Sequence, residues 1–424
     1  MSLFLRNNAL QKLCETHLSS LSREEELPES LLRAALEQGS MVLLGNPAHP
    51  RLEPIVVGQP ARVKINANIG NSAMRNSLPC ELRKLETALA AGTDTIMDLS
   101  TAGNLTAIRR AMLDACPSPL GTVPLYAVAQ KYIDAGKDPA LFDPRELLDE
   151  VAAQAEQGVD FMTLHCGITE RAARWATEEK GRVMGIVSRG GAILARWMRT
   201  RRRENPLLEH YDELIGIARR YNVTFSLGDA LRPGAGADAG DAAQIEEVIV
   251  LGRLARQAFN EGVQCMIEGP GHVPMHEVAG QIQGIKKLTR GAPLYVLGPL
   301  VVDSCPGYDH LAGAIGGAIG VQAGVDFLCY LTPAEHLTLP DAQDVKAGVM
   351  ASRIAAQAGE IALGRPRALR REAAMAGARK NLDWTGMKCA ALDPNMMDDR
   401  RGEHAGEEVC AMCGDFCAVK MARP

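Results

Sequence analysis

The sequence predicts an α/β fold, a (β/α)8 TIM-type barrel, from two observations. From about residue 62 onward, short apolar runs rich in β-branched residues alternate with helical stretches, which is the pattern of parallel strands buried on both faces. The repeat is roughly thirty residues, as in barrels of about 250 residues. The 424-residue chain leaves room for additions at both ends. A doubly wound open sheet is the alternative.

Nine apolar runs compete for the eight strand positions of such a barrel, so one run is expected to have another structure. They are residues 63–69, 95–99, 122–126, 161–165, 183–187, 223–227, 263–267, 295–297 and 327–331. Residues 3–21 and 28–36 instead carry apolar side chains at helical spacing. The predicted organisation is a helical N-terminal extension (1–60), a catalytic barrel (61–365) and a helical tether with a cluster-binding tail (366–424).

The composition argues against several classes of protein. The net charge is −5 and the charges are dispersed, so we expect no nucleic-acid partner. The one basic run, residues 196–203, is interpreted as a solvated helix end, with phosphate binding as the alternative. We see neither an export signal nor a membrane span. Eleven cysteines in such a chain predict free thiols in a reducing cytoplasm.

Three cysteines stand close together near the C-terminus. Cys410, Cys413 and Cys417 are spaced by two and then three residues. Three thiolates on a 4Fe–4S cluster leave one iron open for a substrate or cofactor. The alternative is a structural zinc site in which His404 is the fourth ligand. In either case residues 391–409 are expected to be a mobile tether.

Polar residues follow nearly every predicted strand, where barrels place their active sites. Residues 188–191 offer a hydroxyl, a guanidinium and backbone amides, and are interpreted as a phosphate cradle or as an ordinary glycine turn. Asp229 and Arg232 are placed either to hold a nucleotide-like substrate or to pair with each other. His272 and His336 follow different strands and are candidate ligands of one divalent metal.

Together these motifs resemble one family, that of phosphomethylpyrimidine synthase, the thiamine pyrimidine synthase. The resemblance runs from about residue 60 to the C-terminus and includes the three tail cysteines. It rests on NANIG (66–70), MDLS (97–100), GTVPLY (121–126), IVSRGG (186–191), EGPGHVP (268–274), PGYDH (306–310) and TPAEH (332–336).

The resemblance implies a radical S-adenosylmethionine lyase acting on 5-aminoimidazole ribotide. It implies that Cys410, Cys413 and Cys417 hold a 4Fe–4S cluster, and that His272 and His336 hold a second metal, zinc or iron. An electron donor such as flavodoxin or ferredoxin and a homodimer are further expectations. The positions that match the family's substrate contacts are Asn68, Met97, Tyr126, His165, Ser188, Arg189, Gly190, Asp229, Ala230, Leu231, Arg232, Glu268 and Tyr295.

Some loop residues differ from the expected pattern. Ala230 replaces a glycine, Ser304 and Cys305 replace Ile and Ala, and Ala102 and Thr338 also replace glycines. Several of these positions are expected to lie in active-site loops, where an added methyl or thiol group would reshape the pocket. The differences therefore favour a paralogue, the anaerobic 5-hydroxybenzimidazole synthase of cobamide biosynthesis. The alternative product is the thiamine pyrimidine phosphate, made from the same substrate.

The groups expected to transfer protons are Glu268, Asp309 and His310. Cys305 is interpreted as a hydrogen donor to a radical or as a packing residue. A different class of function, a non-catalytic zinc-tailed barrel that acts in binding or assembly, predicts a colourless protein. The density of polar motifs at the strand ends argues against that class.

Overall fold

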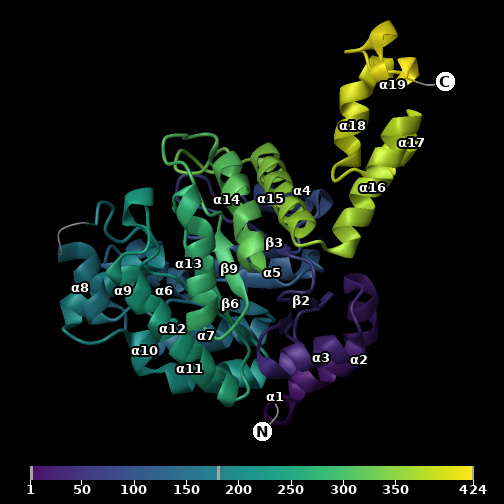
Figure 1. Ribbon diagram of the computed structural model, residues 1–424. Coiled ribbons are helices and arrows are strands. Elements are labelled where there is room, and N and C mark those ends of the chain that lie inside the picture. Colours follow the sequence, from purple (N-terminus) through teal and green to yellow (C-terminus); the bar gives the residue numbers. More distant parts are fainter. Residues whose placement is uncertain (1–2, 179–181, 423–424) are drawn as a thin grey trace. The chain divides into compact units, whose positions relative to one another are not determined.

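A computed structural model of the chain describes residues 3–178 and 182–422 (Figure 1). The chain forms two compact units, Met1–Ala356 and Gln357–Pro424. The first unit contains a closed barrel of eight parallel strands in the order β10-β3-β4-β5-β6-β7-β8-β9. The predicted (β/α)8 fold is therefore confirmed, and the open-sheet alternative is excluded.

The barrel strands are short and almost entirely buried, which explains their continuous apolar character. Each strand pairs in parallel with the next one along the chain, and β10 pairs with β3 to close the barrel. The strands are β3 (Lys64–Ile69), β4 (Thr95–Asp98), β5 (Leu120–Thr122), β6 (Phe161–Leu164), β7 (Thr224–Leu227), β8 (Cys265–Gly269), β9 (Leu294–Leu297) and β10 (Phe327–Cys329).

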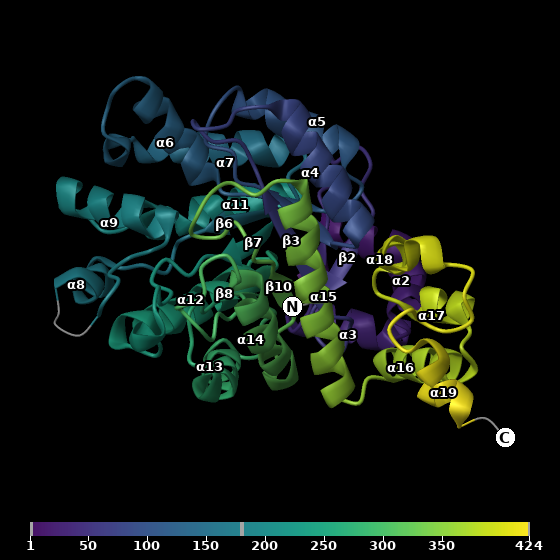
Figure 2. The same ribbon diagram turned by 90° about the horizontal axis from the view of Figure 1, so that it is seen from above.

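Helices surround the strands, as the view from above shows (Figure 2). One helix leads from each strand back to the next strand, and one follows the last strand. In chain order these helices are α4 (Leu78–Ala91), α5 (Leu105–Ala115), α7 (Pro144–Gln157), α11 (Tyr211–Tyr221), α12 (Ala242–Asn260), α13 (Met275–Leu288), α14 (Asp309–Ala323) and α15 (Ala342–Ala362). Extra helices are inserted in three connections. The connection from β5 to β6 contains α6 (Pro124–Asp134) and the 3₁₀ helix η1 (Pro139–Leu141), and the connection from β6 to β7 contains α8 (Glu170–Glu178), α9 (Arg189–Arg201) and α10 (Pro206–Glu209). The connection from β7 to β8 contains the 3₁₀ helix η2 (Gly236–Asp238).

The ninth candidate strand, residues 183–187, is not a strand. Two of its backbone amides bond to a side chain and not to a neighbouring strand. Asp238 accepts hydrogen bonds from Val183 N (2.6 Å) and Met184 N (2.9 Å). Gly185 has φ +63°, which interrupts an extended backbone. The prediction at 122–126 was also misplaced, since β5 ends at Thr122 and Pro124 opens α6.

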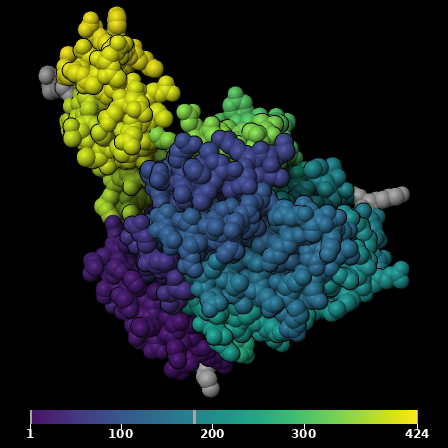
Figure 3. All heavy atoms as spheres, turned by 180° about the vertical axis from the view of Figure 1, so that it is seen from behind, coloured from purple at the N-terminus to yellow at the C-terminus, as the bar shows by residue number. Residues whose placement is uncertain are grey.

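The N-terminal segment begins with the predicted helices, α1 (Leu3–Arg6), α2 (Asn8–Glu25) and α3 (Glu29–Gln38). The sequence did not predict the antiparallel pair that follows, β1 (Val42–Leu44) with β2 (Ile55–Val57). Asp160, just before β6, accepts from Asn46 N (2.7 Å) and bonds His49 Nδ1 (2.8 Å). This segment therefore contacts the amino ends of the barrel strands, and Figure 3 shows it in purple beside the barrel.

Aromatic rings and a buried ion pair lie between the amino ends of the strands and the site. The Tyr295 ring stacks on Phe327 with centroids 4.2 Å apart, and Phe161 packs edge-on against Phe327 at 6.4 Å. Lys64 Nζ lies 2.8 Å from Glu25 Oε1, and both side chains are buried. The barrel interior is therefore filled, and a ligand can enter only at the carboxyl ends of the strands.

The second unit is helical. It contains α16 (Pro366–Asn381), α17 (Trp384–Ala390), α18 (Pro394–Arg401), the 3₁₀ turns η3 (Gly402–His404) and η4 (Gly414–Phe416), and α19 (Ala418–Met421), after the end of α15. The 391–409 segment, expected to be a tether, thus includes a helix. No helix among the described residues is both long and apolar enough to cross a membrane.

One residue organises the turn between α18 and the cysteines. The Arg401 guanidinium lies over the Trp384 ring, 3.6 Å from its centroid. Its Nη2 donates to the carbonyls of His404 (3.0 Å), Ala405 (2.9 Å) and Glu407 (2.8 Å). Trp384 Nε1 donates to the Glu408 carbonyl at 2.9 Å. The chain therefore enters the cysteine segment from a fixed turn.

Candidate active site

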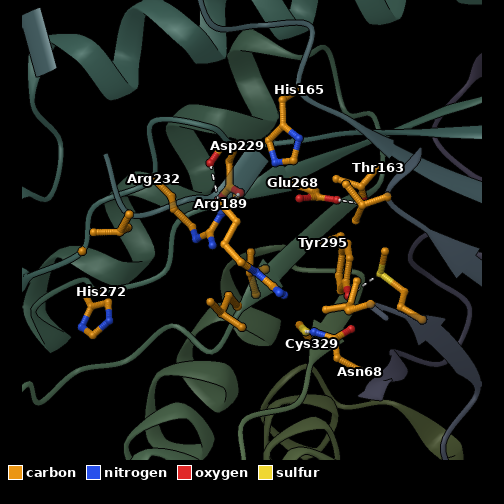
Figure 4. A pocket seen from close by; sticks show the side chains of 18 of the residues that line it. Asn68, Thr163, His165, Arg189, Asp229, Arg232, Glu268, His272, Tyr295 and Cys329 are labelled. Atoms are coloured by element: carbon orange, nitrogen blue, oxygen red, sulfur yellow. Dashed lines mark hydrogen bonds and ion pairs between the residues drawn. The ribbon is translucent and has the colours of Figure 1, made fainter. Parts of the chain in front are cut away.

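A cavity of about 380 Å³ opens at the carboxyl ends of the barrel strands (Figure 4). Residues on or just after all eight strands line it, so the barrel closure brings together loops from the whole chain. The residues singled out from sequence that line the cavity are Asn68, Met97, Tyr126, His165, Arg189, Asp229, Arg232, Glu268, His272, Tyr295 and His336.

One side of the cavity holds a buried carboxyl–guanidinium pair from the loop after β7. Arg232 Nη1 donates to Asp229 Oδ1 (3.2 Å) and to the Asp229 carbonyl (3.4 Å). Burial raises the pKa of Asp229 to about 8, and the Arg232 charge offsets only part of that rise. Asp229 Oδ2 is buried without a hydrogen-bond partner. Near neutral pH Asp229 therefore retains a proton that it can donate to a ligand.

A second buried carboxyl, Glu268, lies at the end of β8. Two hydroxyls from neighbouring strands, Thr163 Oγ1 and Ser226 Oγ, each donate to its Oε1 at 2.7 Å. Burial raises its pKa, and these hydrogen bonds oppose the rise. Thr163 also lines the cavity, two residues before His165 and on the same face of β6. Glu268 is thus fixed in orientation and able to exchange a proton.

The 188–191 segment forms the N-terminus of helix α9, directed at the cavity. Ser188 caps the helix by accepting from Gly191 N (3.2 Å), and its Oγ bonds His165 Nε2 (3.1 Å). The two glycines allow the helix to approach. A Cβ on Gly190 would lie 2.5 Å from the His165 ring, and one on Gly191 would lie 2.6 Å from the Ala230 carbonyl oxygen. Helix N-termini attract anions.

Two cationic or neutral groups flank this helix end. Arg189 places its guanidinium 4.6 Å from the centroid of the Tyr126 ring. His165 is buried, and the loss of hydration, with the charge of Arg232, lowers its pKa to about 3. Its imidazole is therefore neutral, and its Nδ1 lacks a partner among the described residues. The helix end supplies positive potential, while His165 supplies a neutral group for a ligand to bond.

The opposite wall is neutral and rich in sulfur. Asn66 Nδ2 donates to the Tyr295 hydroxyl (2.8 Å), which lies 3.7 Å from Met97 Sδ. Asn68 Nδ2 lies 3.1 Å from Cys329 Sγ. Burial raises the pKa of Cys329 to about 12, so this thiol stays protonated. The cavity therefore has a charged side and an uncharged side.

His272 and His336 come together at the rim. Their ring centroids are 5.5 Å apart. Asp303 Oδ1 lies 2.8 Å from His272 Nδ1, and Asp309 Oδ1 lies 2.9 Å from His336 Nδ1. His336 has φ +61°, a strained conformation for a non-glycine residue that costs about 1–3 kcal/mol. Two imidazoles backed by carboxylates fit a divalent metal.

The three tail thiols differ in their surroundings. Cys410 and Cys413 hydrogen-bond each other, which lowers the pKa of the Cys410 thiol and raises that of Cys413. Cys417 is buried, 5% exposed, whereas Cys413 is exposed. Three neighbouring thiols are the ligand type of an iron–sulfur cluster. Within residues 3–178 and 182–422, however, no three His, Cys, Asp or Glu side chains are close enough to hold a metal ion.

Some residues singled out from sequence lie outside the cavity lining. The lining does not include Ser188 and Gly190 at the start of α9, or Ala230 and Leu231 in the loop after β7. Asp309 pairs with His336. His310 borders a separate small cavity with Ser352 and Cys329, and its Nδ1 has no partner in the described part of the chain.

Sequence reasoning missed other residues that do line the cavity. They are Thr163, Met184, Val187, Cys329 and Glu335. Thr163 could have been found from the two-residue alternation of a strand, because it lies two residues before His165, whereas Cys329 lies two residues before the apolar Leu331 and had no such signal. Met184 and Val187 were hidden by the mistaken strand at 183–187. Glu335 was quoted only as a neighbour of His336.

The unexpected loop residues do not line the cavity. None of Ala102, Ala230, Ser304, Cys305 and Thr338 is among the residues that surround it. Ala230 is fully buried, and the Cys305 thiol donates to the Val302 carbonyl at 3.3 Å. The structural premise for a changed product is therefore absent.

Comparison with known proteins identifies the family. A model of the Radical SAM ThiC family matches residues 5–424. Phosphomethylpyrimidine synthase of Desulfotalea psychrophila is 45% identical over 419 residues, 98% of this chain and 96% of that protein. The one of Syntrophus aciditrophicus is 46% identical over 405 residues, 95% of this chain and 94% of that protein.

The fold also resembles a solved structure of low sequence identity. A dihydropteroate synthase of Xanthomonas albilineans is 11% identical, covers 77% of this chain and 100% of its own, and has a TM-score of 0.44, which carries no argument about function. The family match and the near-full-length relatives are decisive. The chain belongs to the Radical SAM ThiC family, and it is a radical S-adenosylmethionine enzyme.

Proposed function

We propose that this enzyme converts 5-aminoimidazole ribotide to the thiamine pyrimidine, 4-amino-5-hydroxymethyl-2-methylpyrimidine phosphate. The observation that carries the proposal is the identity of 45–46% to phosphomethylpyrimidine synthases across nearly the whole of both chains. The two-sided cavity supports it, because a ribotide carries a phosphate dianion at one end and an amino-substituted ring at the other.

The phosphate would bind at the N-terminus of α9. Arg189 lines the cavity there, and the capped helix end adds backbone amides and the positive end of the helix dipole. A planar guanidinium binds phosphate oxygens in pairs. Arg232 is instead held by Asp229, so its role would be to keep a compensating charge beside the ring or ribose.

The buried carboxyls would bind the hydroxyls and the amine. Asp229 and Glu268 have raised pKa values and can exchange protons near neutral pH. His165 would accept or donate one hydrogen bond through Nδ1. The neutral wall around Tyr295 and Cys329 would cover the ring and exclude water. These residues bind, orient and move protons.

The cofactors would be held by residues already described. Cys410, Cys413 and Cys417 would hold a 4Fe–4S cluster, and His272 and His336 a second divalent metal. When bound, the cluster and S-adenosylmethionine supply the one-electron chemistry that starts the rearrangement. We also propose that a flavodoxin or ferredoxin delivers the electron and that the enzyme works as a homodimer.

The 5-hydroxybenzimidazole product favoured by the loop differences has no specific support. Those residues do not line the cavity, and the similar proteins are named phosphomethylpyrimidine synthases. The thiamine pyrimidine is therefore the better-supported product. 5-Hydroxybenzimidazole becomes an outcome that the product assay must distinguish.

The test is a product assay. The enzyme is reconstituted anaerobically with iron and sulfide and given 5-aminoimidazole ribotide, S-adenosylmethionine and a strong reductant, and the products are identified by mass spectrometry. The proposal predicts the aminopyrimidine phosphate together with 5′-deoxyadenosine. A mass matching 5-hydroxybenzimidazole would overturn the proposed product. Absence of 5′-deoxyadenosine would overturn the proposed chemistry.

A further inference from the structure

We propose that Asp303 and Asp309 are positioning residues that prepare His272 and His336 for one shared divalent cation. From the sequence, Asp309 was assigned to proton transfer, and Asp303 was only part of a polar loop (303–310) with possible acid–base groups. The inference rests on the second-metal site of the proposed function. It adds two carboxylates that act through the histidines and do not touch the cation.

Each aspartate determines which ring nitrogen carries the proton. The 2.8 Å contact from Asp303 Oδ1 and the 2.9 Å contact from Asp309 Oδ1 both reach an Nδ1 atom. An ionised carboxylate only accepts hydrogen bonds, so each Nδ1 must be the protonated nitrogen. In the neutral imidazole this leaves the Nε2 lone pair of both rings free, as a metal ligand requires.

The spacing of the two rings suits one shared ion. Two imidazoles on one tetrahedral zinc ion have centroids about 5.2 Å apart when the Zn–N bonds are about 2.0–2.1 Å. The His272 and His336 centroids are 5.5 Å apart, within a few tenths of an ångström of that value. Both residues line the main cavity, so the remaining coordination positions would be open to a ligand there.

The His272 side of the pair is held by backbone hydrogen bonds. Leu300 N donates to the Gly271 carbonyl (2.8 Å), and Val273 N donates to the Leu300 carbonyl (2.9 Å), which fixes the loop around His272. Asp303 also accepts from Gly236 N at 2.8 Å. Asp303 thus joins the loops after β7, β8 and β9, so its position does not depend on a bound ion.

The His336 side is held by a helix end. Asp309 is the first residue of α14, and its Oδ2 accepts from Gly307 N at 3.2 Å. The Asp309 side chain is only 6% exposed, whereas that of Asp303 is 46% exposed. The partners are exposed in the opposite order, since His336 is 52% exposed and His272 is 12% exposed. Each hydrogen bond therefore has one member shielded from water, and loss of either aspartate should weaken the site.

The test measures zinc binding to the full chain with Cys410, Cys413 and Cys417 replaced by alanine, so that tail thiols do not compete. Zinc affinity is determined by competition with a chromophoric chelator for this protein and for its Asp303→Asn and Asp309→Asn variants. An asparagine keeps the shape but can present its NH₂ group, so it no longer selects the tautomer. Glu277→Gln is the matched control, because Glu277 contacts the exposed His276 at 3.6 Å.

The expected loss of zinc affinity is about 10- to 100-fold for Asp303→Asn and for Asp309→Asn, with Glu277→Gln unchanged. A second readout is the long-range proton–nitrogen spectrum of the metal-free protein labelled with ¹⁵N-histidine. It should show two rings with unprotonated Nε2, and the asparagine substitution should mix the tautomers. Circular dichroism identifies a variant that has merely unfolded. If Asp309→Asn unfolds, Asp303→Asn, whose side chain is near the surface, still provides the test.

Three results would overturn the inference. The first is an unchanged zinc affinity in a folded Asp303→Asn variant, and the second is a proton on Nε2 of the free rings. The third, no zinc binding before any aspartate is changed, would remove the second metal as well. The product assay of the unsubstituted enzyme is an independent test. If that enzyme forms the expected product but the aspartate variants keep their zinc affinity, only the role of the aspartates is rejected. If the aspartate variants lose zinc affinity but the unsubstituted enzyme forms no product, only the proposed reaction is rejected.

Discussion

The barrel mouth and the cysteine tail are built in opposite ways. In the mouth, burial sets the chemistry, since Asp229, Glu268 and His165 have pKa values shifted by lost hydration and are held by fixed partners. In the tail, Cys410 and Cys413 influence each other's pKa, and Cys413 is exposed. A buried site can be complete before its ligand binds, whereas metal-binding thiols gain their final arrangement from the group that they bind.

The largest expected effect comes from breaking the tail. Cys413→Ala should abolish both the iron–sulfur chromophore and all turnover, because two thiolates cannot hold the cluster in place of three. Iron content, visible absorption and product formation measure the loss. Circular dichroism and Tm should stay close to those of the wild type, since the barrel has its own core. Cys389→Ala, an exposed cysteine on α17, is the control and should change none of these.

The next effect comes from the cavity itself. Arg232→Gln should lower kcat/KM by about 10- to 100-fold, since it removes a buried guanidinium from the cavity and leaves the Asp229 carboxyl without its hydrogen-bond donor, at a cost of about 1–3 kcal/mol. The iron content should stay unchanged, in contrast to Cys413→Ala. Arg219→Gln is the matched control, because Arg219 is a half-exposed arginine that pairs with Glu261. Equal kinetics for Arg232→Gln and wild type would contradict the assigned role of the buried pair.

A third prediction concerns pH. Because the folded pKa of Asp229 is raised to about 8, the folded state keeps a proton that the unfolded state releases above about pH 4. The free energy of unfolding should therefore fall as pH rises from about 4 to about 8, by at most about 1.4 kcal/mol per pH unit from this group. The Asp229→Asn variant has no carboxyl to titrate at this position, so its free energy of unfolding should not show this fall. The difference in stability between the variant and the wild type should therefore shift in favour of the variant as pH rises from about 4 to about 8. Urea unfolding at several pH values measures both, and parallel curves would show that Asp229 is ionised throughout.

A smaller effect is expected when a hydrogen-bond donor to Glu268 is removed. Thr163→Val removes one of its two hydroxyl donors, which should raise the pKa of Glu268 further and cost about 1 kcal/mol of stability. The readout is the pH dependence of kcat/KM, whose acidic limb should move to higher pH. Thr177→Val, which removes a hydroxyl bonded only to the Ala173 carbonyl on α8, is the control. If both variants gave the wild-type profile, Thr163 would have no part in setting the proton affinity of Glu268.

The smallest effect is predicted for the loop residue that first pointed to a different product. Ala230→Gly restores the glycine of the family pattern, but the side chain is buried behind the cavity. We expect the product to stay the same and kcat/KM to change by less than about threefold, consistent with a cost below about 1 kcal/mol for a small packing change. A change of product identity by mass spectrometry would show that this position controls the outcome.

The periodic part of the sequence predicted the barrel well. Continuous apolar runs identified seven of the eight barrel strands and reached β5 only at its last residue, Thr122, and helical spacing identified the long N-terminal helices. The error at 183–187 arose because its β-branched residues look like a strand, whereas its amides bond to Asp238, 55 residues away for Val183. Pro124, in contrast, was a local signal for a helix start that the strand assignment at 122–126 overlooked.

The sequence predicted the site residues that directly follow a strand. It did not predict the roles of residues that depend on which side chain they bond in the folded protein. The position of Asp229 and Glu268 follows from the strand ends, but their raised pKa values depend on burial created by the whole barrel. Asp309 was assigned to proton transfer because nothing local shows that its partner is His336, 27 residues later. The hairpin of β1 and β2 was missed because each strand has only three residues.

The most direct test of this comparison is substrate binding without the cluster. Calorimetry would measure the affinity of 5-aminoimidazole ribotide, under anaerobic conditions, for the wild type and for the chain with Cys410, Cys413 and Cys417 replaced by alanine. Since every residue that lines the cavity belongs to the barrel unit, the account predicts the same Kd within about twofold, which is a free-energy difference of about 0.4 kcal/mol. Loss of binding in the cysteine-free chain would contradict a cavity that is complete before the tail acquires its cluster.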